Sequence, residues 1–219
     1  SLVGSEMCIR DRDKLIEQGK VLVNGQVAGM GQQVEETDTV QVGKKILQGK
    51  QTQKVLAFYK PVGVTCTERD PHAEKKIMDM IRYPERLTYA GRLDKDSEGL
   101  ILLTNDGDLI NAMMRGANRH EKEYIVKTDR EITPDFLEKM AKGIYLKDLD
   151  ITTRECEIEQ IGKFTFRIVL TQGVNRQIRR MCEACGYRVK ALKRIRIMNI
   201  LLGDLKPGKW REATGCLLY

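Results

Sequence analysis

Hydrophobic and polar residues follow two different spacings along the larger part of the chain. Apolar runs bounded by polar or turn-forming residues predict strands at Val55–Tyr59, Leu100–Thr104, Tyr124–Lys127, Phe164–Leu170 and Ile195–Leu201. Apolar residues three and four positions apart predict helices at Glu74–Ile81, Asp108–Met114, Pro134–Lys142 and Asn175–Cys185. Because the strands do not alternate regularly with the helices, the pattern favours an α+β domain over a doubly wound parallel sheet.

A separate pattern marks the N-terminal part of the chain. Lys14–Gln18 reads as the end of a helix, and Val21–Val23 and Gln26–Ala28 flank the turn-forming pair Asn24-Gly25, which predicts a β-hairpin. Thr39–Val42 alternates like a further strand, and a polar stretch follows. We therefore expect a small unit at residues 13–48, a linker at 49–53 and one larger domain at 54–215.

The two ends of the chain fit neither spacing. Residues 1–12 (SLVGSEMCIRDR) resemble translated sequencing-adapter DNA, and residues 216–219 (CLLY) resemble its companion at the other end. Both segments are expected to be non-native, although the frayed ends of a natural chain would look similar.

The charge of the chain favours a polyanionic partner. Its 219 residues carry a net charge of +7 with a pI near 9.1, and residues 173–211 hold eleven Lys or Arg against two acidic residues. A one-sided basic cluster of this kind binds phosphates, although a solvated Lys-rich surface would give the same total charge. Aromatic residues make up only 5%, so stacking platforms for several unpaired bases are sparse.

Cysteine usage and hydropathy indicate the compartment. Six scattered cysteines in a chain of this length argue against a disulfide-stapled secreted scaffold and for a reducing cytosol. No stretch approaches the ~20 apolar residues of a membrane span. The N-terminal segment also lacks the basic and apolar regions of a signal peptide. We expect a cytoplasmic monomer without a membrane partner.

The segment Ala90–Gly107 (AGRLDKDSEGLILLTNDG) concentrates the candidate chemistry. By spacing alone it reads as an acidic turn before a core strand. Asp94, Asp96 and Glu98 also begin like a calcium-binding loop, but the twelfth position is Asn105 and not a bidentate Glu. A calcium site is therefore not expected.

Two further motifs that could indicate a metal site are incomplete. A zinc-protease motif would need His at position 124, where the sequence has Tyr124. Cys182 and Cys185 lack a second ligand pair at zinc spacing. With Ile178 and Met181 they form one apolar stripe of the helix that Asn175 is expected to cap and Gly186 to end, so they read as packed thiols.

The stretch GRLDKDSEGLILLTNDG resembles a motif of the RsuA-type pseudouridine synthases, bacterial enzymes that modify ribosomal RNA. The resemblance extends to KPVG at Lys60–Gly63, HEKEY at His120–Tyr124 and GVNRQIRRMC at Gly173–Cys182, and it covers almost everything from Lys14 to Trp210. HEKEY, RIRIMNI and NRQIRRMCEACGY look closest to the F branch of the large-subunit enzymes. The N-terminal unit resembles the second half of an S4 RNA-binding module, for which a generic β-hairpin is the alternative.

The resemblance implies a pseudouridine synthase fold with a mixed, mainly antiparallel sheet, and isomerisation of uridine in RNA without a cofactor. Asp94 matches the family's nucleophile, and Arg179 matches the arginine that pairs with it. Tyr124 matches a tyrosine proposed to help remove the C5 proton, although a phenol is a poor base unless its pKa is shifted. Arg92 would fill the space that the extruded base leaves, or contact a phosphate.

The partner that the resemblance implies is 23S rRNA, with tRNA as a second candidate. Further basic residues are expected to hold the RNA, namely Arg176, Arg180, Lys193, Arg194 and Arg196. The alternative is a non-catalytic RNA-binding or ribosome-assembly protein, which would share the basic surface. The presence of Asp94 favours the enzyme, because only the enzyme needs a nucleophilic carboxylate.

Overall fold

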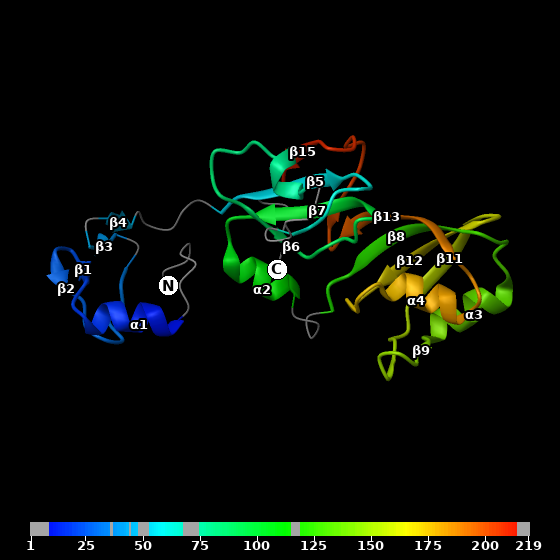
Figure 1. Ribbon diagram of the computed structural model, residues 1–219, viewed down its shortest axis with the longest axis horizontal. Helices are drawn as coiled ribbons and strands as arrows, with labels where there is room; N and C mark the ends of the chain where they lie inside the picture. Colours follow the sequence, from blue (N-terminus) through cyan, green and yellow to red (C-terminus); the bar gives the residue numbers. More distant parts are fainter. Residues whose placement is uncertain are drawn as a thin grey trace. The chain divides into compact units, whose positions relative to one another are not determined.

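The computed structural model describes residues 9–35, 37–43, 45–47, 53–67, 75–114 and 119–213. Two compact units make up the chain, an N-terminal unit of Ser1–Gln53 and a C-terminal unit of Lys54–Tyr219 (Figure 1). Most of the expected linker and of the two expected non-native ends lies outside the described residues. Within those residues, no helix is long and apolar enough to cross a membrane.

The N-terminal unit contains one helix and a small antiparallel sheet. Its elements are α1 (Ile9–Glu17), β1 (Val21–Val23), β2 (Gln26–Val27), β3 (Val40–Val42) and β4 (Lys45–Leu47), with strand order β2-β1-β3-β4. The predicted hairpin is confirmed: Asn24 and Gly25 have φ angles of 52° and 82°, the left-handed conformation that a tight two-residue turn requires. The small core gathers Val21, Val23 and Ala28 against α1.

A nine-stranded sheet is the frame of the C-terminal unit. Its strands are β5 (Val55–Lys60), β6 (Thr88–Ala90), β7 (Glu98–Thr104), β8 (Lys122–Thr128), β11 (Glu157–Gly162), β12 (Thr165–Leu170), β13 (Val189–Ile197), β14 (Ile200–Leu201) and β15 (Trp210–Glu212). They run in the order β11-β12-β8-β13-β7-β5-β15, while β14 pairs with β13 and β6 with β7. Every pair is antiparallel except β13 and β7, so the predicted mixed, mainly antiparallel sheet is confirmed.

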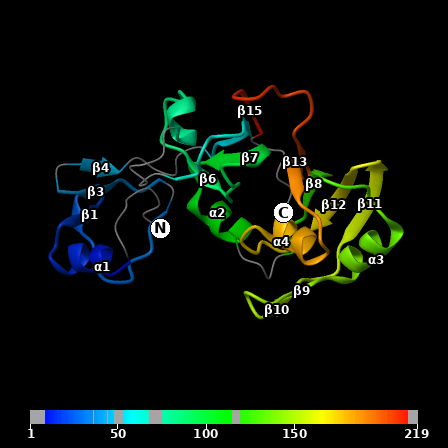
Figure 2. The ribbon, with the colours of Figure 1, turned by 45° about the vertical axis from the view of Figure 1, so that its right-hand side comes forward.

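Short helices cover parts of this sheet. The described part contains α2 (Gly107–Met114), α3 (Pro134–Lys142), α4 (Gln177–Ala184) and the 3-10 helix η1 (Ile77–Met80), together with a small pair of strands, β9 (Tyr145–Leu146) and β10 (Ile151–Thr152). Figures 1 and 2 show α3 and α4 over one face of β8, β12 and β11. Phe136 and Met140 of α3 and Met181 of α4 are fully buried there against Phe166 and Ile168 of β12.

Three predicted elements differ from the structure. The helix predicted at Glu74–Ile81 is reduced, in its described part, to the 3-10 helix η1. The strand predicted at Ile195–Leu201 is interrupted, because Met198 adopts a left-handed φ of 52° and reverses the chain between β13 and β14. The helix predicted from Asn175 begins at Gln177, and its N-cap is Arg176, with φ 51° and ψ 33°.

Gly99 lets β7 approach β13 next to the loop that carries Asp94. Its φ is +111°, and a Cβ atom added there would lie 2.2 Å from the backbone oxygen of Arg194. The two strands pair in parallel at this point, with Gly99 beside Arg194. A glycine is therefore required both by the backbone conformation and by the contact.

Candidate active site

A cavity of about 760 Å³ lies in the C-terminal unit beside the loop between β6 and β7. The three residues predicted to be catalytic, Asp94, Tyr124 and Arg179, all line this cavity, although they are far apart in the sequence. Of the residues expected to bind RNA, it also gathers Arg92, Arg176 and Arg194. A cavity of this size is ample for one nucleotide base.

Asp94 lies on a turn that the KPVG motif holds in place. The amide of Ser97 donates to the carbonyl oxygen of Asp94 at 3.1 Å and closes the turn. The amide of Gly63 donates to Lys95 O at 2.8 Å, and the fully buried Lys60 donates from Nζ to Ser97 O at 2.7 Å. Burial lowers the pKa of Lys60. The two motifs therefore form one structural unit beneath the carboxylate.

Arg176 and Arg179 contact different carboxylates. Arg176 Nη1 lies 3.4 Å from Asp94 Oδ2, and its Nη2 lies 3.1 Å from Asp96 Oδ2. Arg179 Nη2 lies 3.2 Å from Asp96 Oδ2 and donates to the backbone oxygen of Asp96 at 2.9 Å and to Ser97 Oγ at 3.2 Å. In the described structure the carboxylate of Asp94 has its ion pair with Arg176.

The prediction that Arg179 pairs with Asp94 is therefore wrong. Arg179 is 14% exposed and holds the underside of the turn, whereas Arg176 is 41% exposed and reaches both carboxylates. The left-handed backbone of Arg176 places this residue ahead of the first turn of α4. The helix thus supplies one arginine that supports the turn and a second that contacts the nucleophile candidate.

The arginines favour the ionised form of this acidic turn. Burial raises the pKa of Asp96, but the hydrogen bond from Arg176 and the charges of Arg179 and Arg176 outweigh it and hold that pKa below its ordinary value. Arg176 in turn has a raised pKa, chiefly through its hydrogen bond to Asp96. Asp94 itself keeps 35% of its side chain exposed, so it remains open to the cavity.

Tyr124 reaches the cavity from the middle of the sheet. Its strand β8 lies between β12 and β13, where Tyr124 pairs with Ile168 on one side and Arg194 on the other. The partly buried ring packs against the core cluster beneath α3 and α4. The sheet on both sides therefore fixes the position of this side chain.

The residues expected to bind RNA have different environments. Arg92 is exposed at the cavity. Arg180 pairs with Asp148 and donates to Asn175 O at 2.9 Å, and Lys193 lies over the Tyr59 ring at 5.0 Å from its centroid. Neither of these two residues lines the cavity.

Arg194 is buried, which argues against its predicted role as an RNA contact on the surface. The residue is 2% exposed, and its Nε donates to Leu100 O at 2.7 Å while its Nη1 donates to Arg92 O at 3.4 Å. Its Nη2 is buried without a hydrogen-bond partner. Arg194 thus supplies a buried positive charge in the wall of the cavity.

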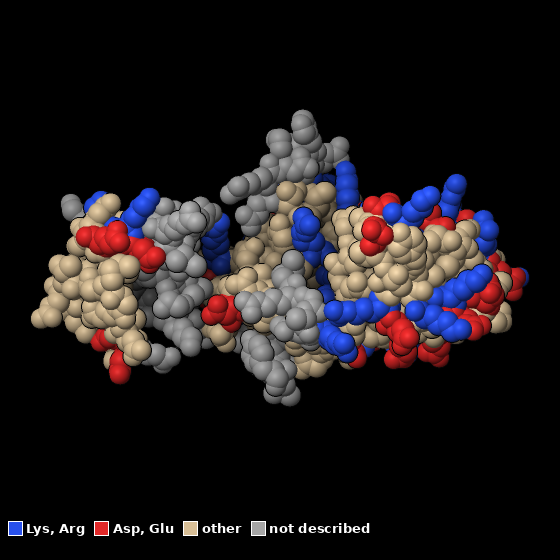
Figure 3. Space-filling model, turned by 90° about the horizontal axis from the view of Figure 1, so that it is seen from below, with Lys and Arg blue, Asp and Glu red and all other residues tan. Residues whose placement is uncertain are grey.

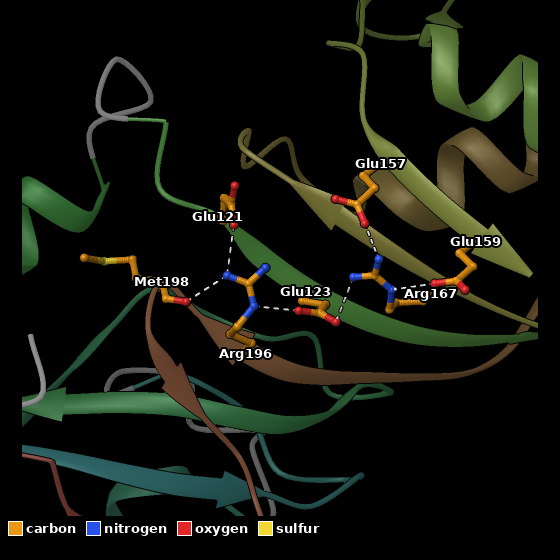
Figure 4. A network of polar contacts seen from close by, with 7 residues as sticks. All are labelled: Glu121, Glu123, Glu157, Glu159, Arg167, Arg196 and Met198. Atoms are coloured by element: carbon orange, nitrogen blue, oxygen red, sulfur yellow. Dashed lines mark hydrogen bonds and ion pairs between the residues drawn. The ribbon is translucent and has the colours of Figure 1, made fainter. Parts of the chain in front are cut away.

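Arg196 belongs to an ion-pair network that crosses four strands. Figure 4 shows the members of this network, which are Glu121 and Glu123 of the β8 region, Glu157 and Glu159 of β11, Arg167 of β12, and Arg196 and Met198 of the β13 region. Arg196 Nε lies 2.5 Å from Glu123 Oε2, and Arg167 Nη1 lies 3.1 Å from Glu123 Oε1. These carboxylates neutralise Arg196, which argues against its predicted role as an RNA contact.

Basic and acidic side chains are interspersed on one face of the C-terminal unit. Figure 3 shows blue Lys and Arg side chains next to red Asp and Glu side chains on that face. The cluster of positive charge counted along the sequence is therefore partly neutralised by acidic residues from other segments. Arg180 with Asp148 is one example.

Sequence reasoning missed three basic residues that line the cavity, namely Lys95, Lys122 and Arg154. Lys122 lies two positions before Tyr124 in HEKEY, so the period-two rule of a strand places both on one face. That spacing was the available signal. Arg154 follows β10 and is exposed, and no motif marks it.

The cysteine pair of α4 is packed in the core. Cys182 is fully buried and Cys185 partly buried, and both are free thiols. Burial raises the pKa of Cys182 to about 12. Their predicted place in the apolar stripe is confirmed. Across the described ranges, no group of three or more His, Cys, Asp or Glu side chains could hold a metal ion.

Comparison with known proteins agrees with this fold and this arrangement of motifs. A family model described as RNA pseudouridylate synthase matches residues 54–184. The dual-specificity RNA pseudouridine synthase RluF of Escherichia coli strain K12 is 44% identical over 207 residues, which are 94% of this chain and 70% of that protein. The ribosomal large subunit pseudouridine synthase B of Vibrio cholerae is 34% identical over 93% of this chain and 66% of that protein.

A solved structure also supports a pseudouridine synthase fold. The crystal structure of a pseudouridylate synthase superposes with a TM-score of 0.71 at 26% identity, over 96% of this chain and 92% of that one. Fold and sequence together define an enzyme that isomerises uridine in RNA. The chain belongs to the RNA pseudouridine synthase family, within its RsuA-type branch, as its motifs predicted.

Because Arg176 and Arg179 make different contacts, their replacement is expected to have different effects on stability and on activity. Arg179→Met should lower the free energy of unfolding by about 1–3 kcal/mol, because it removes charge-assisted hydrogen bonds under the turn. Arg176→Met should change stability by only about 0.5 kcal/mol, since this ion pair is largely exposed. It should nevertheless lower the single-turnover rate on the order of 10²-fold by misplacing Asp94.

Urea denaturation and single-turnover assays at saturating RNA check this pair of variants. Arg176→Lys is the matched control, because it keeps the charge and loses only the planar fork, and it should retain intermediate activity. Wild-type activity in Arg176→Met, together with a large rate loss in a stably folded Arg179→Met, would restore Arg179 as the partner of Asp94.

Proposed function

We propose that this protein converts uridine to pseudouridine in 23S rRNA of the large ribosomal subunit, with Asp94 as the nucleophile. The observation that carries the proposal is the cavity in which the Asp94 carboxylate lies open beside Arg176, on a turn held by Lys60 and Arg179. The name of the Vibrio cholerae relative supports the large subunit as the substrate. The dual specificity in the name of the Escherichia coli relative supports a second RNA substrate, for which tRNA is our candidate.

The proposed roles follow from the bonds that change. The C1′–N1 bond of uridine breaks, the base turns, and a C1′–C5 bond forms, with no net oxidation. An ionised carboxylate aimed into a cavity can attack the nucleotide covalently, and Arg176 keeps Asp94 oriented for this. Tyr124 lines the same cavity and is placed to assist the removal of the C5 proton.

Access to the base requires that the uridine leave its stack. Extruding a base costs a few kcal/mol, which contacts between basic side chains and the surrounding phosphates can offset. The exposed Arg92, two residues before Asp94, is placed to occupy the vacated stack or to hold a phosphate. The N-terminal unit is proposed to act as an S4-like RNA anchor, and the protein as a cytoplasmic monomer.

Mapping pseudouridine in cellular RNA tests the proposed substrate. Deleting the gene should remove at least one pseudouridine from 23S rRNA, and returning the wild-type gene should restore it. A strain that carries the Asp94→Asn gene is the matched control and should match the deletion. Loss of pseudouridine from tRNA alone, with an unchanged 23S map, would contradict the large-subunit assignment and leave the family membership untouched.

A further inference from the structure

Lys122, like Arg194, is a largely buried cation of the cavity wall that has no carboxylate partner among the described residues. It lies on β8 between Leu170 of β12 and Ile197 of β13. Among the described residues, its Nζ has one hydrogen bond, to His120 O at the long distance of 3.5 Å. No carboxylate among the described residues lies within ion-pair distance of it. Burial and the nearby charge of Arg194 lower the pKa of Lys122.

The wall around Lys122 carries an excess of positive charge. The described residues that line the cavity include seven Lys or Arg and a single carboxylate, that of Asp94. Arg176 and Arg179 form ion pairs with Asp94 and Asp96, but within the described residues Arg194 donates only to backbone carbonyl oxygens. A half-enclosed wall with unneutralised cations favours a ligand that is, or becomes, negatively charged.

The isomerisation supplies such a charge on the base by either route. If Asp94 attacks C1′, the C1′–N1 bond breaks and N1 keeps the electron pair, so the ring becomes an anion with charge on O2 and O4. If Asp94 adds to C6 of the base, the C5–C6 π electrons move onto C5 and O4 as an enolate. In the first route C5 attacks C1′ and displaces the Asp94 carboxylate. In the second route C5 attacks C1′ while the C1′–N1 bond breaks, and the Asp94 carboxylate then leaves C6. In both routes C5 loses its proton and N1 gains one, so atoms and electrons balance.

We propose that Lys122 is a further catalytic residue, whose ammonium group contacts the extruded uracil and neutralises the negative charge that the ring acquires during isomerisation. Arg194 adds a second positive charge close by from β13. Lys122 and Tyr124 share one face of β8 and line one cavity, so both reach the base from the same side. A cation placed in advance where charge develops is worth far more in an enclosed site than in water.

This inference rests on the proposed function, and a kinetic split tests it. Lys122→Met should lower the single-turnover rate at saturating RNA on the order of 10²-fold, with unchanged RNA affinity. Lys122→Arg keeps the charge and should stay within about tenfold of the wild type. Lys127→Met is the matched control, because Lys127 lies exposed on the other face of the same strand and should behave as wild type.

The pH profile gives a second readout that a merely structural role would not move. The charge that acts on Lys122 is that of Arg194 from β13. The titratable or charged groups that share the cavity with it include His120 and Tyr124 of its own segment, and Asp94 and Arg92. The protonated ammonium is the active form, so activity should be present below its lowered pKa and fall as the pH rises through it, at a pH below the ordinary 10.5. Lys122→Arg should lack this alkaline fall, because guanidinium does not titrate there.

The possible outcomes distinguish a catalytic role of Lys122 from a role in binding phosphate, and distinguish failure of this inference from failure of the proposed function. If Lys122 binds a backbone phosphate, Lys122→Met will weaken RNA binding and reduce its salt dependence by about one ion, with the saturated rate unchanged, which overturns the proposal. A rate equal to wild type also overturns it, as does a Lys122→Arg variant as slow as Lys122→Met. If Lys122→Met does not fold, the rates of Lys122→Arg and Lys122→Gln decide instead. Absence of pseudouridine with the wild-type protein would refute the proposed function itself.

Discussion

Replacing Asp94 by Asn is expected to abolish pseudouridine formation while leaving the fold and RNA binding intact. The amide preserves the shape of the side chain but removes the charge that makes it a nucleophile, so the rate should fall by at least about 10⁴-fold. Asp94 is 35% exposed, and the ion pair that it forms with Arg176 is also exposed, so stability should change by less than about 1 kcal/mol. Mass spectrometry of the digested RNA measures the product.

Measurements of folding and of RNA binding show whether a loss of activity in Asp94→Asn reflects the loss of the nucleophile. Thermal denaturation should place Asp94→Asn close to the wild type, and RNA affinity at a fixed salt concentration should be the same within about threefold. Product at more than a few per cent of the wild-type level would remove Asp94 from its role. Loss of binding along with activity would instead make it an RNA contact.

Replacing Gly99 by Ala is expected to cause the largest loss of stability. The added Cβ would lie 2.2 Å from the backbone oxygen of Arg194, and a φ of +111° already disfavours any side chain. Backbone atoms cannot rotate away as a flexible side chain would, so β7 and β13 must separate. We expect the free energy of unfolding to fall by more than about 4 kcal/mol. The turn that carries Asp94 should lose its support as well.

Gly91→Ala is the matched control for this loss. Gly91 also has a positive φ, +83°, but an added Cβ would meet no atom within 4 Å. Gly91→Ala should therefore lower the free energy of unfolding only by the energy of holding an alanine in the left-handed conformation, roughly 1–2 kcal/mol. Urea denaturation of both variants therefore separates the backbone strain from the close approach. Equal losses in the two variants would show that the contact with Arg194 contributes nothing.

Local signals in the sequence were sufficient for elements that neighbouring residues determine. The helix Pro134–Lys142 has its predicted bounds because Thr133 accepts a hydrogen bond from Phe136 N and proline occupies the first turn. The Asn24-Gly25 turn likewise forms the hairpin that its backbone preferences predict. The family motifs also marked Asp94, Tyr124 and Arg179, which the fold brings to one cavity.

Contacts between segments that are far apart in the chain could not be predicted from the sequence. The left-handed Arg176 decides which arginine meets Asp94, and no local signal marks that conformation in a residue other than glycine, Asn or Asp. The apolar run at Ile195–Leu201 hides the reversal at Met198. Charge counted along the chain could not show that Arg196 is neutralised by Glu121 and Glu123, which belong to another strand.

Release of tritium from RNA carrying [5-³H]uridine is the most direct measurement of the central claim, because the C5 hydrogen leaves only if C5 forms the new bond. Asp94→Asn and Asp96→Asn should be compared under single-turnover conditions, since both carboxylates lie on one turn and contact Arg176. The account predicts one tritium for each pseudouridine with the wild type, slower release with Asp96→Asn, and none with Asp94→Asn. Release by Asp94→Asn, or its absence only in Asp96→Asn, would contradict the assignment of Asp94 as the nucleophile.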